Sequence, residues 1–248
     1  MKVICVIHLP PLPGSPLYQN ESLEEIVERV VEDARAIEEG GADGVIVENF
    51  EDKPFRVKVG PETVASMSVI AREVRKEISL SLGINVLRND GISALAIAKA
   101  VKADFVRVNQ LFFPSVSPEG TLEPIAADLM RYKKFIDCKA KVFADVNVKH
   151  AKHFADMEDY AENFERSLAD AAIVTGSATG KSVRLEELEL FRKRLDCEVY
   201  AGSGVTPELA SKIARKGLAD GVIVGTYIKR RGRIDSGRVR EVVEAVKK

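Results

Sequence analysis

The chain has 248 residues, 46% of them hydrophobic, and its 37 basic residues nearly balance its 38 acidic ones, for a formal net charge of -1. Without an excess of positive charge, the composition argues against a protein that neutralises a nucleic-acid backbone. The apolar runs are far shorter than the roughly 20 residues that a bilayer-spanning helix needs, so no membrane insertion is expected. We expect a cytoplasmic protein without a targeting segment. Its abundance of Glu, Lys and Arg is typical of thermophiles.

Short β-branched runs alternate with amphipathic stretches from end to end, as in repeated βα units. Strands are predicted at residues 3–8, 45–49, 81–87, 105–109, 141–146, 171–175, 198–201 and 221–225. Eight such units in a chain of this length predict a single (β/α)8 TIM-barrel domain spanning residues 1–248. An open doubly wound sheet is the alternative, but no G-x-G-x-x-G motif follows the first strand.

Start and stop signals support the helices between these strands. Ser22 precedes Glu25 at the spacing of a capping box, and Gly40 follows the apolar stripe that begins there. Pro61 and Pro207 stand where a helix begins, a position at which a missing N–H costs nothing.

Polar residues gather at the carboxyl ends of the predicted strands, the face at which barrels carry their active sites. Buried polar groups are costly unless they pair with one another or with a ligand, so this set predicts a ligand site more than a self-satisfied network. As catalytic candidates we name Asp145 or Glu48 as general base, Lys149 as electrophile or Schiff-base nucleophile, and His8. Asp145, Asn147 and Lys149 would share one face if the strand stays extended. The candidates for substrate binding are Asn85, Arg88, Asn89, Arg107, Asn109, Asn147 and Thr175.

Two glycine-containing loops follow the last two predicted strands. Residues 201–208 read Ala-Gly-Ser-Gly-Val-Thr-Pro-Glu, and residues 224–226 read Val-Gly-Thr. Glycine lets backbone N–H groups approach a bound group, and Thr206 or Ser203 can cap the next helix, whose positive end attracts anions. Loops at this position commonly hold phosphate in barrels. We therefore predict a phosphate site made by Gly202, Ser203, Gly204, Gly225 and Thr226.

Other segments allow more than one interpretation. Residues 175–182 are glycine-rich but lack the first glycine of a Walker A motif; with Lys181 they would close over a substrate or form a plain flexible loop. The proline-rich residues 9–16 predict a stiff loop rather than a ligand for a proline-reading domain. The basic run 229–233 would extend the anion site or form a solvated turn. The histidines lack metal-binding spacing, so neither a metal nor a cofactor is predicted.

Together these motifs resemble the BtpA family, also called SgcQ-like, over essentially the whole chain. The resemblance rests on residues 7–14, 43–50, 85–90, 105–109, 144–151 and 202–207 with Gly225 and Thr226. It implies a barrel similar to the ribulose-phosphate-binding enzymes, in a family named after a protein required for photosystem I biogenesis. Asn147 departs from the pattern, in which a more variable, often charged or histidine-like residue is expected.

The phosphate loops and the convergent acids predict an enzyme acting on a small phosphorylated metabolite, a sugar or nucleoside-like phosphate, by acid–base or carbon-skeleton chemistry without a redox cofactor. An isomerase, lyase or transferase would fit. The rival hypothesis is a non-catalytic assembly or biogenesis factor that uses the barrel as a scaffold, marked by a protein partner and an exposed apolar patch. A homo-oligomer is compatible with either function.

Overall fold

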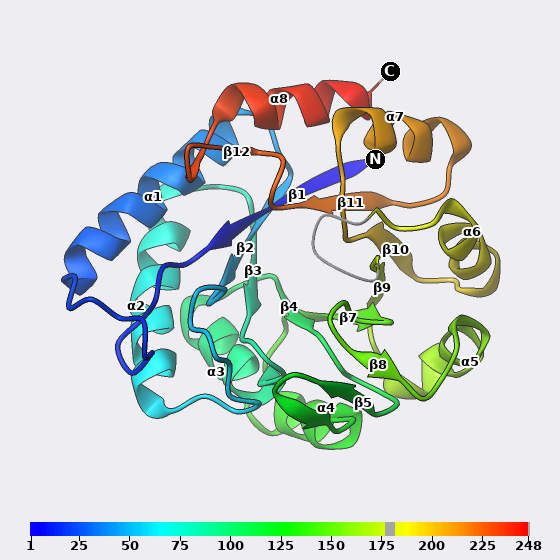
Figure 1. The fold of residues 1–248 in the computed structure, drawn as a ribbon, viewed down its shortest axis with the longest axis horizontal. Coiled ribbons are helices and arrows are strands. Elements are labelled where there is room, and N and C mark those ends of the chain that lie inside the picture. The colour runs from blue at the N-terminus through cyan, green and yellow to red at the C-terminus, as the bar shows by residue number, and fades with distance from the viewer. Residues whose placement is uncertain (177–181, 248) are drawn as a thin grey trace.

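The computed structural model describes residues 1–176 and 182–247, and its central feature is a closed barrel of eight parallel strands ringed by helices (Figure 1). Around the barrel the strands follow the order β1-β11-β10-β9-β7-β4-β3-β2. Their bounds are β1 Lys2–His8, β2 Gly44–Glu48, β3 Ser81–Asn85, β4 Phe105–Val108, β7 Lys141–Val146, β9 Ala171–Val174, β10 Glu198–Ala201 and β11 Gly221–Val224. The helices are α1 Leu23–Glu39, α2 Pro61–Glu77, α3 Gly91–Val101, α4 Ala126–Phe135, α5 Met157–Asn163, α6 Leu185–Arg194, α7 Pro207–Lys216 and α8 Ser236–Ala245, with a 3-10 turn at Phe164–Ser167. The TIM-barrel prediction is confirmed.

All eight predicted strands are present, and their ends differ from the predicted ends by at most two residues. The local signals also hold: Ser22 and Glu25 form the capping box of α1, and Gly40 ends that helix. Pro61 and Pro207 lie in the first turns of α2 and α7.

Two small antiparallel elements were not predicted. Strands β5 (Ser115–Ser117), β6 (Gly120–Leu122) and β8 (Lys152–His153) form a sheet beside the barrel mouth, and β12 (Lys229–Arg230) pairs with β13 (Arg233–Ile234). Strands of two or three residues are too short to show an alternating pattern in sequence.

The barrel interior is filled by an apolar layer made of Ile4, Val6, Ile46, Phe105, Phe143, Ala171, Ile173, Tyr200 and Ile223. Two glycines make room for its largest rings: a Cβ at Gly83 would lie 2.3 Å from Phe105, and one at Gly221 would lie 2.3 Å from Tyr200. Because side chains alternate along a strand, the residues two positions after Val6, Ile46 and Phe105 also face inward, one layer higher. The fold thus sets a second, polar layer above the apolar one.

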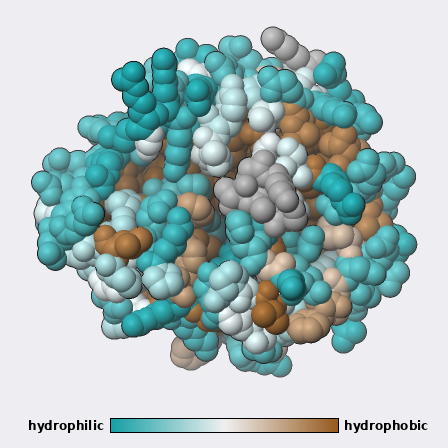
Figure 2. Space-filling model, viewed as in Figure 1, coloured by the Kyte–Doolittle hydropathy of each residue, from teal (hydrophilic) through white to brown (hydrophobic). Residues whose placement is uncertain are grey.

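The face that carries the strand ends is mainly hydrophilic, with hydrophobic residues in separate patches (Figure 2). Of the helices in residues 1–176 and 182–247, none has both the length and the apolarity needed to cross a bilayer.

Candidate active site

Four polar side chains stand side by side at the carboxyl ends of β1 to β4. His8 is in register with Glu48, Glu48 with Asn85, and Asn85 with Arg107. Glu48, Asn85 and Arg107 are each no more than 5% exposed. These residues were nominated from the sequence on separate strands, and the parallel register brings them into one row of the polar layer.

The Asp145 carboxylate, on β7, is occupied by two partners. Nε and Nη2 of Arg107 donate to its two oxygens at 2.9 Å each, and Asn109 Nδ2 donates to Oδ2 at 2.8 Å. Burial acts to lower the pKa of Arg107, but the charges of Asp145 and Glu48 outweigh it and raise that pKa. Both carboxylate oxygens are thus engaged by charge-assisted or amide hydrogen bonds from within the protein. Asp145 is therefore placed to anchor Arg107.

Glu48 is less enclosed by donors. Its Oε2 accepts a hydrogen bond from Asn85 Nδ2 and lies 3.6 Å from Arg107 Nη1, whereas Oε1 faces His8 Nε2 at 3.7 Å. Burial alone would raise the pKa of Glu48, but the charge of Arg107 and the hydrogen bond from Asn85 lower it. Glu48 is thus ionised at neutral pH, and one of its oxygens is available as a base.

His8 is a buried, neutral imidazole. Its ring stacks on Phe50 with 4.0 Å between centroids, and Nδ1 lies 2.9 Å from Lys229 Nζ. Burial lowers the pKa of His8 to about 4, and Lys229 adds to this effect while Glu48 opposes it. An ammonium group only donates, so Nδ1 accepts and the proton of the neutral ring sits on Nε2, the atom that faces Glu48.

Lys229 was not among the residues nominated from the sequence. It lies in the β12–β13 hairpin. From the sequence, the basic run 229–233 in this hairpin is expected either to extend the anion site or to form a solvated turn. The contact with His8 places Lys229 at the edge of the site. Charge spacing alone carries no signal for a contact between the first strand and a hairpin near the end of the chain.

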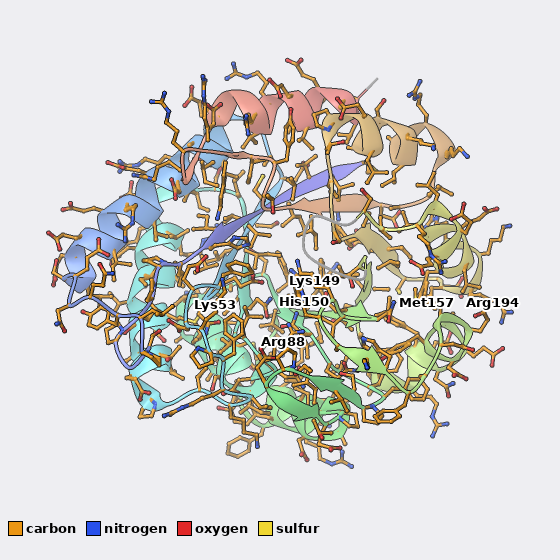
Figure 3. All side chains as sticks on the ribbon, in the orientation of Figure 1. Lys53, Arg88, Lys149, His150, Met157 and Arg194 are labelled. Atoms are coloured by element: carbon orange, nitrogen blue, oxygen red, sulfur yellow. The ribbon has the colours of Figure 1, made fainter. Side chains whose placement is uncertain are left out.

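The loop after β7 carries Lys149 and is held by its backbone carbonyls. Three successive carbonyls each accept a hydrogen bond from a side chain of another segment: Asn147 O from Thr175 Oγ1 (2.9 Å), Val148 O from His153 Nε2 (2.9 Å) and Lys149 O from Arg88 Nη2 (2.6 Å). Figure 3 shows Lys149 and His150 toward the centre of the ring of strands and Arg88 farther out, on the side of β5 and α4.

The sequence-based expectation that Asp145, Asn147 and Lys149 share one face of an extended strand is wrong. Strand β7 ends at Val146, and Asn147 has a left-handed φ of 55°. Asparagine tolerates that conformation better than most residues, which fits its place at the turn. Lys149 reaches the site through the turn rather than through strand alternation.

Asn89, Thr175 and Arg88 were nominated as substrate-binding residues, but their observed bonds are within the protein. Asn89 Nδ2 donates to Gln110 O at 3.0 Å, and its Oδ1 accepts from Gln110 N at 2.9 Å. Thr175 and Arg88 hold the Lys149 loop. Asn89 and Thr175 thus support the site without lining it, whereas Arg88 also lines one of its cavities.

Asn85 and Asn109 differ, because each turns its amide nitrogen toward a carboxylate and leaves its carbonyl oxygen unsatisfied. Asn85 Oδ1 and Asn109 Oδ1 are buried and accept no hydrogen bond from the described residues. The amide orientation is fixed, since only nitrogen can donate to Glu48 and Asp145. An unsatisfied buried acceptor fits a ligand hydroxyl or amine.

The two glycine loops carry backbone donors. Within residues 1–176 and 182–247, the N–H groups of Gly204, Gly225 and Thr226 have no hydrogen-bond acceptor. Thr206 caps α7 beside them by accepting the N–H of Leu209 at 3.3 Å. Free N–H groups at a helix N-terminus are the setting in which proteins bind anions.

Gly202 and Gly225 serve local packing. Gly202 N–H donates a hydrogen bond to Val174 O at 2.8 Å, and a Cβ at Gly202 would lie 2.4 Å from Ile173 Cγ2. A Cβ at Gly225 would lie 3.2 Å from His8 Nε2. Both glycines keep the barrel mouth narrow where the two loops meet the polar layer.

Two adjoining cavities share Glu48, Arg107 and Lys149. One is lined by residues 202–205 and 225–227 together with His8. The other has a volume of about 310 Å³ and a mixed lining of apolar and charged side chains, among them Phe50, Phe55, Leu87, Arg88, Asn109 and Glu119. Residues 177–181 of the glycine-rich stretch, with Lys181, lie outside the described residues.

Solved structures similar to this chain are barrels. Thiamine phosphate pyrophosphorylase from Pyrococcus furiosus matches with a TM-score of 0.64 at 19% identity, covering 99% of this chain and 95% of its own. N-(5'-phosphoribosyl)anthranilate isomerase from the same organism matches with a TM-score of 0.63 at 14% identity, covering 100% and 98%. At such low identity the likeness shows the fold alone.

Sequence relatives extend along the whole chain. A protein of Archaeoglobus fulgidus is 61% identical over 99% of this chain and 98% of its own, and such heat-loving relatives agree with the composition. The photosystem I biogenesis protein BtpA of Synechocystis is 38% identical, over 98% and 87%. A mitochondrial protein of Caenorhabditis elegans is 32% identical, over 98% and 92%. The BtpA family model matches residues 1–248, and the chain therefore belongs to the BtpA family.

Proposed function

We propose that this chain is an enzyme that acts on a small phosphorylated metabolite, a sugar or nucleoside-like phosphate, by acid–base chemistry at the barrel mouth. One observation carries the proposal. A single cavity is lined by both glycine loops and by His8, Glu48, Arg107 and Lys149. A phosphate on the loops would therefore hold the rest of the molecule against the ionisable groups.

The phosphate end is supported by charge as well as by shape. The N–H groups of Gly204, Gly225 and Thr226, which find no acceptor among the described residues, and the N-terminus of α7 supply partial positive charge. Each backbone donor binds an anion without the entropic cost of ordering a long side chain. Ser203, also in the lining, stays in the proposed phosphate site.

The groups proposed for proton transfer are Glu48 and His8. Glu48 is ionised and would take a proton from substrate, whereas neutral His8 presents Nε2–H and would donate a hydrogen bond to the substrate oxygen on which charge develops. A carboxylate base beside a neutral imidazole that polarises a carbonyl is a known arrangement for proton transfer at neutral pH. Hydroxyl groups of a sugar-like substrate would satisfy Asn85 Oδ1 and Asn109 Oδ1.

The test is thermal melting of the purified protein with inorganic phosphate, sugar phosphates and nucleotides. A ligand at a hundred times its Kd stabilises the fold by about 2.7 kcal/mol. We expect one phosphorylated class to raise Tm, and Gly204→Val to abolish the rise. Gly217→Val is the matched control, because Gly204 and Gly217 both have φ of 62° but Gly217 ends α7 away from the loops.

Turnover is then followed with the class that binds. Glu48→Gln should keep the phosphate-dependent rise in Tm and lose turnover by at least about 100-fold, the usual contribution of a general base. Unchanged turnover in Glu48→Gln would reject the acid–base assignment. A flat response of Tm to every phosphorylated compound would reject the phosphate site.

A scaffold role is the second candidate, and the name of the Synechocystis relative, photosystem I biogenesis protein BtpA, favours it. A photosystem cannot be the common client of the family, since the relative in the animal Caenorhabditis elegans spans nearly the whole chain. Co-purification with a defined protein, without turnover of any phosphorylated compound, would support the scaffold.

A further inference from the structure

Lys149 is set apart from the other cations of this site. Arg107 is paired with Asp145, Arg88 lies 3.5 Å from Glu119, and Lys229 contacts His8. Lys149 Nζ has no hydrogen bond or ion pair with any other described residue. It nevertheless lines both cavities at the point where they meet.

The surroundings of Lys149 favour the neutral amine. Burial lowers its pKa, and the charges of Arg107 and Arg88 lower it further, against the opposing effect of Glu48 and Asp145. An amine attacks a carbonyl only when it is unprotonated, and desolvation beside another cation is a known way to activate a lysine. A lysine that served only to bind anions would gain no affinity from neighbouring positive charges that lower its pKa.

The backbone of Lys149 is fixed more firmly than anion binding requires. Side chains from three other segments, Thr175, His153 and Arg88, hold the carbonyls of residues 147 to 149. A nucleophile must be positioned within a fraction of an ångström, because misplacement by about 1 Å costs roughly 100-fold in rate. Ammonium groups that bind phosphate, by contrast, act as point charges on flexible stems.

The groups needed for proton transfer stand in the same cavity. Glu48 and His8 line it together with Lys149. Formation of an imine needs a base that moves the amine proton and a donor that stabilises charge on the carbonyl oxygen; Glu48 supplies the first and His8 Nε2–H the second.

We propose that Lys149 is an amine nucleophile that forms an imine with the carbonyl carbon of a phosphorylated aldehyde or ketone. This inference rests on the proposed function, from which it takes the phosphate end of the ligand, and it narrows the substrate to carbonyl compounds. It also selects the Schiff-base role from the two that the sequence allowed for Lys149.

The Nζ lone pair forms a C–N bond while the carbonyl π electrons move to oxygen, which accepts a hydrogen bond from His8 Nε2–H. Glu48 removes one proton from Nζ and passes it to that oxygen, giving a neutral carbinolamine and restoring the carboxylate. One proton from solvent then protonates the hydroxyl group, and the C–O bond breaks as the nitrogen lone pair forms the C=N bond. The products are an iminium ion and one water molecule, with a net uptake of one proton. Hydrolysis reverses the same steps.

Reductive trapping tests the imine directly. The protein is incubated with dihydroxyacetone phosphate, ribose 5-phosphate or ribulose 5-phosphate and sodium cyanoborohydride, followed by mass spectrometry of the intact chain and its peptides. We expect an adduct on Lys149 with the mass of the carbonyl compound less one oxygen atom. Lys149→Arg should abolish it, and Lys139→Arg should not, because Lys139 is 84% exposed and paired with Asp137.

A second measurement does not depend on guessing the substrate. With limiting formaldehyde and cyanoborohydride at neutral pH, we expect Lys149 to be methylated before Lys139 despite its burial, because more of it is unprotonated. Methylation of Lys149 after Lys139 would overturn the proposal, as would trapping of the phosphorylated compounds only on other lysines.

The two claims fail separately. If phosphorylated compounds raise Tm but Lys149 is neither trapped nor methylated early, the imine is rejected and the phosphate site stands. If Lys149 is trapped equally by dihydroxyacetone and by its phosphate and no phosphorylated compound raises Tm, the imine stands and the proposed function is rejected.

Discussion

The titration of His8 should appear as a pH dependence of folding stability. Its pKa falls from 6.5 to about 4 on burial, with a further lowering by Lys229. In this range the unfolded chain binds a proton at His8 and the folded protein does not, so the free energy of unfolding decreases as pH falls through this window. At 1.36 kcal/mol per pKa unit, the loss between pH 6.5 and pH 4.5 is about 2 kcal/mol.

The assay is urea unfolding of the wild type and His8→Gln at a series of pH values between 6.5 and 4.5. The difference between the two proteins isolates His8, because the other two of the 3 histidines are present in both. Glu48 does not dominate this window, since its pKa is lowered from 4.5 and its contribution is lost at more acid pH. Identical pH slopes for the two proteins would refute a neutral, buried His8.

Three more predictions concern single side chains. Arg107→Met should lower the free energy of unfolding in urea by about 3–5 kcal/mol, because it leaves buried carboxylates without their cation. The control Arg192→Met breaks a partly exposed ion pair and should lower it by less than about 1 kcal/mol. Equal losses in the two variants would contradict the anchoring role of Arg107. Lys229→Met should raise the pKa of His8 in an NMR titration, although burial still lowers it; an unchanged midpoint would exclude their contact. Gly202→Ala should lower the free energy of unfolding by about 1–3 kcal/mol through overpacking. An unchanged free energy of unfolding would show that the neighbouring side chains shift to make room for the methyl group.

The fold could be predicted because its two periodicities are local. Strand alternation and helix caps depend on residues close together in the sequence, such as Ser22 and Glu25, and tertiary packing did not override them. The polar layer could also be predicted, since the carboxyl end of each strand is recognisable even when its partner strand is not. The row from His8 to Arg107 is the result.

The roles within the layer could not be assigned from sequence. Asp145 and Glu48 are equivalent candidates until the two hydrogen bonds from Arg107 distinguish them. The support of the Lys149 loop depends on Arg88, His153 and Thr175. His153 lies only five residues after Val148, but the contacts of Arg88 and Thr175 are set by the closure of the barrel, and no spacing along the chain encodes them.

The central claim is that the glycine loops hold a phosphate against Glu48 and His8. The most direct measurement is a crystal structure of the protein soaked with inorganic phosphate or with a phosphate ester that raises its Tm. We expect a phosphate within hydrogen-bond distance of the N–H groups of Gly204, Gly225 and Thr226, with the organic part of an ester reaching Lys149. A phosphate bound elsewhere, with these N–H groups left to water, would contradict it.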